Sequence, residues 1–263
     1  MTVLVISNQK GGVGKTTTAI SLGAAFVTRG QRVLIVDLDP QANATSGLGV
    51  SKEPPNAMYG VLLREQPLTD SISTTALARL DIVASGPDMA GAEVELVPLM
   101  AREFRLRQAL RGATGYDTVI VDCPPSLGLL TINALAGGDA VLIPVQCEYY
   151  ALEGLAQLLK TIEAVHDRLN PGLEVAGIVL TMEDRRNRLS LQVIDEVRRH
   201  FPNLVTASRI PRTVRLAEAP SHGLPISMYD PQSPASQAYD DLARELAERL
   251  ARREPIAATG AIA

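Results

Sequence analysis

Tryptophan is absent from this 263-residue sequence, and aromatic residues make up only 3% of it. Because 46% of the residues are nevertheless hydrophobic, the core must be built mainly from Val, Ile, Leu and Ala. Such a core is typical of a parallel β-sheet that is buried on both faces. A chain of this length can form one large α/β domain, and two small domains are the less favoured alternative.

Cysteine is nearly absent too: Cys123 and Cys147 both lie in apolar runs and are interpreted as reduced core residues of a cytoplasmic protein. No apolar run reaches the roughly 18 residues of a membrane span, and the N-terminus enters a strand directly. We therefore expect neither a membrane helix nor a signal peptide. The net charge of −4 gives no general support to nucleic-acid binding, which would need a local basic patch.

Lysine is scarce, with four residues in the whole chain (Lys10, Lys15, Lys52 and Lys160). Two of the four lie in residues 9–17, which read Gln-Lys-Gly-Gly-Val-Gly-Lys-Thr-Thr. This segment follows the apolar residues 3–6 and opens a stretch with a helical pattern. The order strand, glycine-rich turn, helix is typical of a phosphate-binding loop.

The chemistry of such a loop depends on its backbone. Glycines let consecutive N–H groups converge on an oxyanion, and the N-terminus of the following helix adds positive partial charge. The Lys15 side chain can then reach the β- and γ-phosphates of a bound nucleotide, while the Thr16 hydroxyl can ligate Mg²⁺. The residues predicted to hold the nucleotide here are Lys10, Gly11, Gly12, Val13, Gly14, Lys15, Thr16 and Thr17.

Apolar runs alternate with amphipathic stretches along the rest of the chain. Strands are predicted at residues 3–6, 33–36, 80–84, 116–122, 140–145 and 175–180, with a short apolar run at 204–205. Helices are predicted at residues 16–28, 59–64, 90–111 with a break at Pro98, 152–169, 189–201 and 234–253, and a loop at 40–60. This alternation predicts a doubly wound, mostly parallel sheet flanked by helices, in one domain over residues 1–253 with a disordered tail at 254–263.

Acidic residues follow two of the predicted strands, where open parallel sheets place their ligands. Asp37 and Asp39 come after the strand at 33–36, and Asp122 ends the strand at 116–122. Asp122 matches the position of a Walker B aspartate, which orients Mg²⁺ through a bound water. The alternative is a structural aspartate that caps Ser126 or the following helix.

The string Lys10-Gly-Gly-Val-Gly-Lys15-Thr, with Gln9 where the usual loop has glycine, resembles the deviant Walker A motif. That family includes the partition ATPases, division-site selector ATPases, arsenite-pump ATPases and nitrogenase iron proteins. The resemblance implies an ATP-sandwiched homodimer in which Lys10 reaches the partner subunit's nucleotide. The iron proteins add a further alternative for the two cysteines, as cluster ligands.

The string Asp37-Leu-Asp39-Pro-Gln41 is similar to the second signature of the same family. The resemblance implies that Asp39 positions or activates the attacking water and that Asp37 supports the site. The catalytic residues implied are therefore Lys10, Lys15 and Asp39. Because Lys10 would arrive only on dimerisation, we expect weak turnover coupled to association, which suits a switch.

Residues 41–49, 144–154 and 210–223 resemble the chromosomal ParA-type partition ATPases, also called Soj, and the likeness spans residues 2 to about 250. This narrower resemblance implies that Pro211 and Arg212 flank the adenine. It also implies that Glu148 and Tyr149 lie on the dimer side.

The same group binds DNA without sequence preference through arginines. Eight arginines fall within residues 185–215, with Asp195 and Glu196 as the acids between them. Such a patch suits phosphate contacts, which give salt-sensitive affinity. The residues predicted to contact double-stranded DNA are Arg186, Arg188 and Arg215, and the alternative is an arginine-rich helix that is merely solvated.

The function that the resemblance implies is an ATP hydrolase that dimerises with ATP, coats the nucleoid and segregates a chromosome or plasmid. A centromere-binding partner of the ParB (Spo0J) type would stimulate hydrolysis. The main alternative is a membrane-binding ATPase like MinD, whose anchor is a basic, bulky-apolar C-terminal helix; residues 255–263 carry no charge and no aromatic, so we expect no membrane contact. A relative that positions another cargo, such as a carboxysome, is a third possibility. The lack of an N-terminal DNA-binding domain is expected to exclude the larger plasmid type.

Overall fold

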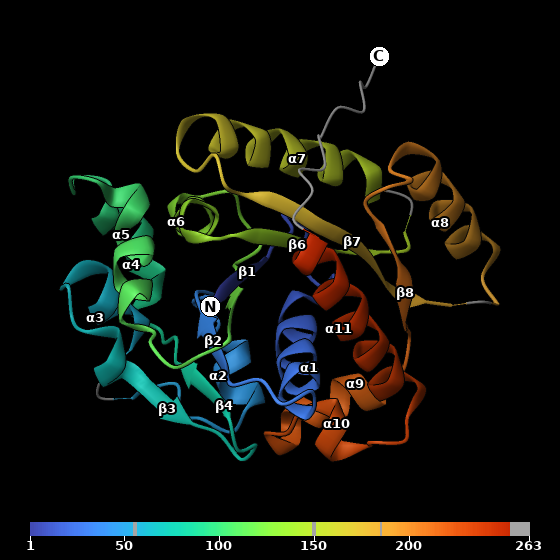
Figure 1. Cartoon of the computed structure of the whole chain (residues 1–263), viewed down its shortest axis with the longest axis horizontal. Coiled ribbons are helices and arrows are strands. Elements are labelled where there is room, and N and C mark those ends of the chain that lie inside the picture. Colours follow the sequence, from blue (N-terminus) through green and yellow to red (C-terminus); the bar gives the residue numbers. More distant parts are fainter. Residues whose placement is uncertain (55–56, 149–150, 185, 253–263) are drawn as a thin grey trace.

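The computed structural model describes residues 1–54, 57–148, 151–184 and 186–252. Within them, eight strands form one sheet in the order β3-β4-β2-β5-β1-β6-β7-β8 (Figure 1). All neighbouring pairs are parallel except β3 with β4. The strands are β1 (Thr2–Ile6), β2 (Val33–Asp37), β3 (Ile72–Thr74), β4 (Leu80–Val83), β5 (Thr118–Asp122), β6 (Ala140–Gln146), β7 (Glu174–Glu183) and β8 (Val205–Pro211). The predicted doubly wound, mostly parallel sheet is confirmed.

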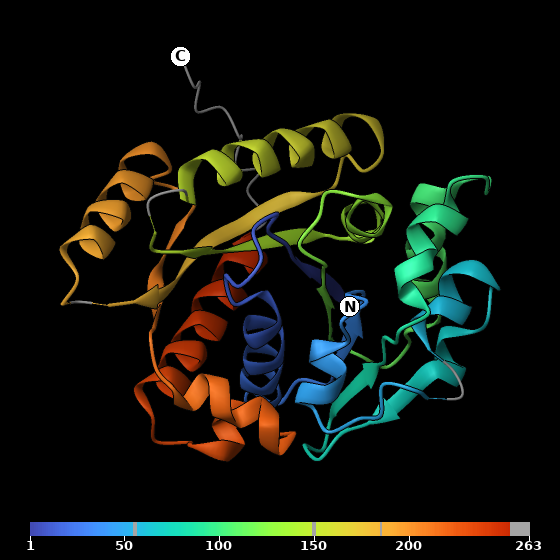
Figure 2. The same ribbon diagram turned by 180° about the vertical axis from the view of Figure 1, so that it is seen from behind.

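Helices cover both faces of the sheet (Figures 1 and 2). One face carries α1 (Lys15–Thr28), α2 (Asn43–Gly47), α9 (Arg215–Glu218), α10 (Ile226–Tyr229) and α11 (Pro234–Arg252). The other carries α3 (Met58–Leu63), α4 (Met89–Leu96), α5 (Arg105–Ala109), α6 (Leu129–Gly137), α7 (Ala151–Arg168) and α8 (Arg188–His200). Short 3₁₀ turns are η1 (Leu68–Ser71), η2 (Arg102–Phe104), η3 (Leu110–Gly112) and η4 (Ala219–His222). None of the helices in the described residues combines the length and apolar character that a membrane crossing needs.

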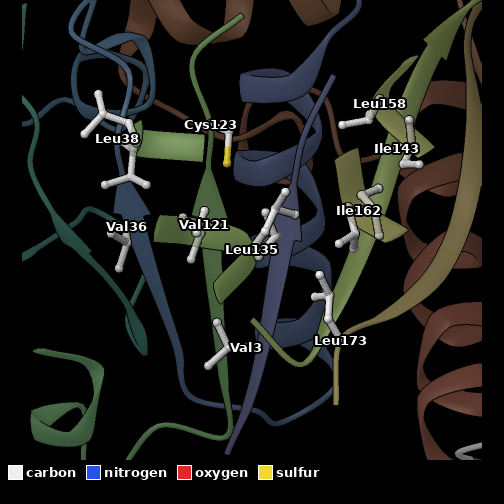
Figure 3. Packing of buried hydrophobic residues seen from close by; sticks show 14 of the residues in the cluster. Val3, Val36, Leu38, Val121, Cys123, Leu135, Ile143, Leu158, Ile162 and Leu173 are labelled. Carbon is white, nitrogen blue, oxygen red and sulfur yellow. The ribbon is translucent and has the colours of Figure 1, made fainter. Parts of the chain in front are cut away.

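The core is aliphatic on both faces, as the composition predicts. Figure 3 shows Val3 and Val121 of the central strands, and Cys123 directly after β5, in the apolar cluster that also contains Leu135 of α6, on the face that carries α7. Cys123 and Cys147 are both free and buried, which agrees with their interpretation as core residues. The apolar layers on the two faces of the sheet hold the carboxyl ends of its strands in fixed positions.

A glycine of helix α1 faces the sheet where a larger side chain would be crowded. A Cβ at Gly23 would lie 3.3 Å from side-chain carbons of both Ile35 and Leu80, which is a tight contact. Glycine is therefore what lets α1 approach β2 and β4. The glycine-rich loop leads into the N-terminus of this helix at Lys15.

The outermost strand β8 is covered by two side chains of α11. The Glu245 carboxylate accepts hydrogen bonds from the backbone N–H groups of Ala207 at 2.9 Å and Ser208 at 3.0 Å. Arg249 donates to the carbonyl oxygens of Leu204 and Val205 at 3.3 and 3.1 Å. The Leu204 carbonyl oxygen also accepts the Ile178 N–H of β7, whereas the N–H groups of Ala207 and Ser208 have Glu245 as their acceptor.

Several elements differ from the sequence-based prediction. Residues 40–60 are not all loop, because Asn43–Gly47 forms α2. The short apolar run at 204–205 leads into the strand β8, which begins at Val205 and ends at Pro211. The helix expected at 90–111 is broken near Pro98 as predicted, into α4 and α5. Strand β3 and helix α6 were not predicted. The predictions for Tyr149, Arg185 and the tail at 254–263 lie outside the described residues.

Candidate active site

The loop between β1 and α1 lies at the carboxyl edge of the central strands. Gly12 and Gly14 have φ angles of +75° and +87°, a left-handed conformation that glycine adopts without steric cost. The Thr181 hydroxyl of β7 donates to the Val13 carbonyl oxygen at 2.8 Å and fixes the loop from the side. Gly11 and Gly12 are exposed at the rim. The loop is thus preformed and open for an anion to approach its backbone N–H groups.

Lys15 begins α1 inside this loop, and only 6% of its surface is exposed. Its Nζ donates to the Lys10 carbonyl oxygen at 3.1 Å. Burial lowers the pKa of Lys15, and the nearby Asp122, Cys123 and Asp39 act in the opposite direction. A phosphate could replace the carbonyl as acceptor and would also neutralise the ammonium group.

Asp122 ends β5 with a completely buried carboxylate. Neither of its oxygens has a hydrogen-bond partner among the described residues, so it caps neither Ser126 nor α6 there. Burial and the Asp37 carboxylate raise its pKa well above the ordinary value, while the Thr16 hydroxyl and Lys15 lower it. An unpartnered buried carboxylate is costly, which indicates that a further group belongs beside it. A hydrated Mg²⁺ fits, because hydroxyl and carboxylate oxygens are the donors that this ion prefers.

Asp37 is buried at the end of β2 and holds the backbone that follows it. Its Oδ1 accepts the Asp39 N–H at 3.1 Å, and its Oδ2 accepts the N–H and the hydroxyl of Thr45 at 2.9 and 2.7 Å. Burial raises the pKa of Asp37 to about 6 although these hydrogen bonds lower it. Asp39 is 7% exposed, and its Oδ1 accepts the Gln41 N–H at 2.9 Å. Asp39 also lies close enough to influence the pKa values of Lys15 and Asp122.

Lys10 occupies the rim of the loop rather than its interior. Its Nζ pairs with the Glu148 carboxylate at 2.9 Å, and its backbone N–H donates to Asn8 Oδ1 at 3.0 Å. Asn8 in turn donates to the Pro144 carbonyl oxygen at 2.7 Å, which ties the loop to β6. Both charged side chains of the Lys10–Glu148 pair remain partly exposed, at 37% and 52%.

A cavity of about 350 Å³ opens beside the loop. Gly14 and Thr17 line it together with Met182, Pro211 and Arg212. The structure therefore brings the two residues predicted to flank the adenine next to the phosphate-binding loop. A base in this cavity would be within reach of a triphosphate held at Lys15.

Comparison with known proteins agrees with this geometry. A family model described as an AAA domain matches residues 1–175. The chain is 53% identical over 247 residues to the sporulation initiation inhibitor protein Soj of Bacillus subtilis, covering 93% of this chain and 98% of that protein. It is 51% identical over 260 residues to the chromosome partitioning protein ParA of Caulobacter vibrioides, covering 97% of each. This chain belongs to the ParA/Soj family of chromosome-partitioning ATPases.

The ParA/Soj fold is also found among solved structures. The structure of cobyrinic acid a,c-diamide synthase from Mycobacterium smegmatis with bound ATP analogue and magnesium matches with a TM-score of 0.85 and 37% identity. The match covers 97% of this chain and 98% of that one. The family that the Walker-type motifs indicated is thus confirmed, whereas the roles of individual residues stay predictions.

The arginines that the ParA/Soj resemblance singled out lie at one edge of the sheet. Arg186 and Arg188 follow β7, and Arg215 follows β8, which is parallel to β7, so both loops leave at the same edge. Arg186 and Arg188 are exposed. Arg215 pairs with Glu218 at 3.1 Å and Asp230 at 3.6 Å. The three arginines therefore follow strands that end at the same side of the sheet, but Arg215 already forms ion pairs with acidic residues of its own chain.

One residue that sequence reasoning missed is Thr45. Its hydroxyl is bonded within the Asp37 cluster and is completely buried. The sequence signal was weak, because a threonine eight residues after an aspartate in a polar stretch is typical of a loop.

Proposed function

We propose that this chain is an ATP-driven switch for DNA segregation, with one ATPase domain over residues 1–253. ATP-bound homodimers bind double-stranded DNA without sequence preference in the cytoplasm, and a ParB/Spo0J-type centromere-binding partner stimulates hydrolysis and release. The observation that carries the proposal is the buried, unpartnered Asp122 carboxylate beside Lys15 at the preformed glycine loop. Membership of the ParA/Soj family supports it.

Nucleotide binding rests on the loop and the adjoining cavity. The backbone from Lys10 to Thr17 cradles the phosphates, and Lys15 exchanges its bond to the Lys10 carbonyl for phosphate oxygens. Pro211 and Arg212 flank the adenine in the cavity beside Gly14. Thr16 would hold Mg²⁺ directly and Asp122 through water, and the ion would neutralise charge on the phosphate oxygens.

Hydrolysis needs an oriented water, and we assign its orientation to Asp39. The Asp39 N–H is fixed by Asp37, and Asp39 Oδ1 accepts from Gln41, so a water can bond the second carboxylate oxygen. Phosphoryl transfer requires mainly positioning and charge neutralisation. Asp39 therefore acts as the water-orienting residue, with Lys15 as the cation on the same chain.

Dimerisation supplies the second cation. Lys10 leaves Glu148 and reaches the nucleotide of the partner subunit, so an exposed ion pair is exchanged for contact with a triphosphate. Exposed ion pairs contribute little stability, so this exchange carries a small cost. Because charge neutralisation is complete only in the dimer, turnover is weak and coupled to association.

DNA binding uses the arginines at the β7 and β8 edge. Arg186 and Arg188 are free to meet phosphates, and Arg215 exchanges Glu218 and Asp230 for phosphate oxygens. A dimer presents two such groups, so its affinity for DNA exceeds that of a single chain. Binding of this kind weakens steeply with salt.

The decisive experiment measures binding to a random-sequence duplex with ADP and with a non-hydrolysable ATP analogue, at two salt concentrations. We expect analogue-dependent binding that weakens with salt and is lost in Arg215→Ala. The matched control is Arg244→Ala, because Arg244 is also exposed and paired with an acid of its own helix, Asp241. Equal binding with both nucleotides would contradict the switch.

A further inference from the structure

Thr45 lies where β2, α2 and the segment after β4 meet. The side chain is completely buried. Its hydroxyl donates to Asp37 Oδ2 at 2.7 Å and accepts the Ser85 N–H at 3.0 Å. Its own N–H donates to the same Asp37 oxygen at 2.9 Å. One hydroxyl therefore joins a strand-end carboxylate to the backbone that follows a second strand.

These hydrogen bonds fix the orientation of the Asp37 carboxylate. With Oδ2 held twice by Thr45, Oδ1 is directed at the backbone and accepts the Asp39 N–H at 3.1 Å. Hydrogen bonds to a carboxylate are among the stronger ones in proteins. The place of the Asp39 backbone thus depends on Asp37, and the orientation of Asp37 depends on Thr45.

The hydroxyl cannot be replaced by an apolar group of the same shape. The hydroxyl is donor and acceptor at once. With valine at this position, the buried Ser85 N–H would lose its acceptor and Asp37 Oδ2 would lose one of its two donors. The two Thr45 bonds also counteract the rise that burial causes in the pKa of Asp37. The hydrogen bonds of Thr45 run to the ends of β2 and β4 rather than to the glycine loop that would hold the phosphates.

We propose that Thr45 is a positioning residue for ATP hydrolysis by this chain. Through the Asp37 carboxylate, its hydroxyl holds Asp39 at the place where the attacking water is oriented. The proposal rests on the proposed function, in which Asp39 orients that water. Loss of the Thr45 hydroxyl should therefore slow turnover and leave nucleotide binding nearly unchanged.

The test compares Thr45→Val, Thr45→Ser and the control Ser46→Ala in steady-state phosphate release. Ser46 is the next residue of α2, and its hydroxyl donates to the Ala42 carbonyl oxygen at 3.0 Å. For Thr45→Val we expect kcat to fall by about tenfold or more, because misplacement near the reacting groups is costly. KM for ATP should stay within about threefold of the parent, and Thr45→Ser should keep most of kcat. If the role of Thr45 were merely structural, kcat would not fall while KM stayed nearly constant, and Thr45→Ser would not retain the activity that Thr45→Val loses.

The proposal is overturned if Thr45→Val keeps the parent kcat, or if Thr45→Ser loses as much activity as Thr45→Val. If Thr45→Val does not fold, Thr45→Cys against Thr45→Ser decides: the weaker thiol donor should give the lower kcat at equal melting temperature, and equal kcat overturns the proposal. Failure of the proposed function looks different, because the parent chain itself would then release no phosphate from ATP. Backbone hydrogen exchange at Asp39 and Ser85 needs no turnover, and we expect it to speed up in Thr45→Val but not in Ser46→Ala. Unchanged exchange at both amides would count against the positioning role.

Discussion

Asp37 and Asp122 are register partners on the neighbouring strands β2 and β5, and both carboxyl groups are completely buried. Burial comes first among the causes that raise the pKa values of both, and the charge of Asp37 adds to the rise at Asp122. Two carboxyl groups in one dry site repel each other and favour a bound cation. The carboxyl groups at the ends of β2 and β5 therefore favour binding of Mg²⁺, the cation that accompanies ATP.

The first prediction concerns the pH dependence of stability without nucleotide. The pKa of Asp37 rises from an ordinary 3.8 to about 6 in the folded chain, so the folded state holds this proton more tightly than the unfolded state. The stabilising contribution is complete only well below pH 3.8, falls as the pH rises from there, and is lost once the pH passes 6. The parent should therefore lose roughly 2 kcal/mol of unfolding free energy relative to Asp37→Asn between pH 4 and pH 7.

Urea unfolding of both proteins at several pH values measures this difference. Asparagine carries no charge, so the substitution also removes the charge that raises the pKa of Asp122. The pH-dependent part of the difference therefore reports both carboxyl groups, while lost hydrogen bonds add a constant amount. A parent-minus-variant difference that stays level across the range would show that the Asp37 carboxyl is not protonated preferentially in the folded chain.

The second prediction concerns pairing of two chains. Lys10→Ala should remain monomeric with a non-hydrolysable ATP analogue while the parent forms dimers, because the proposed dimer would then lack the cation that bridges to the partner's nucleotide. Light scattering after size exclusion measures the mass directly. Lys160→Ala is the matched control, since Lys160 is an exposed lysine of α7, and it should pair like the parent. Unchanged pairing of Lys10→Ala would contradict the sandwich.

The third prediction separates binding from turnover at Asp39. Asp39→Ala should dimerise with ATP but release phosphate at least about 100-fold more slowly, because the water loses its orienting carboxylate. Asp240→Ala on α11 is the control, because Asp240 pairs with Arg29 on the surface. If Asp39→Ala hydrolyses ATP at the parent rate, another group orients the water.

The fourth prediction concerns the cover of strand β8. Glu245→Ala should lower the free energy of unfolding by about 1–3 kcal/mol, because two backbone N–H groups and the Ser208 hydroxyl lose their acceptor. Glu248→Ala on the same helix is exposed and should change it by less than about 0.5 kcal/mol. Chemical denaturation measures both. Equal effects of the two substitutions would mean that the Glu245 bonds add no stability.

The central part of the site was predictable because it is local in sequence. The glycine loop, Lys15 and Thr16 are contiguous, and Asp37 and Asp122 each end an apolar run, so the parallel sheet brings them to one edge. The Lys10–Glu148 pair was not predictable, because 138 residues separate its members and only the fold brings them together. Sequence could name Glu148 only through family resemblance.

The elements that were missed are short or depend on distant contacts. Helix α2 has five residues, too few for a periodic pattern, and it forms where the Asp37 carboxylate takes up the Thr45 N–H. Strand β3 has three residues and pairs only with β4 at the sheet edge. The base cavity is made of residues from four regions of the chain, so no single stretch revealed its shape.

The Glu245 carboxylate also affects how a second chain could pair with the outermost strand. An incoming strand that added to β8 at Ala207 and Ser208 would first have to displace this carboxylate from their N–H groups. Growth into a continuous ribbon of strands is therefore opposed at that place.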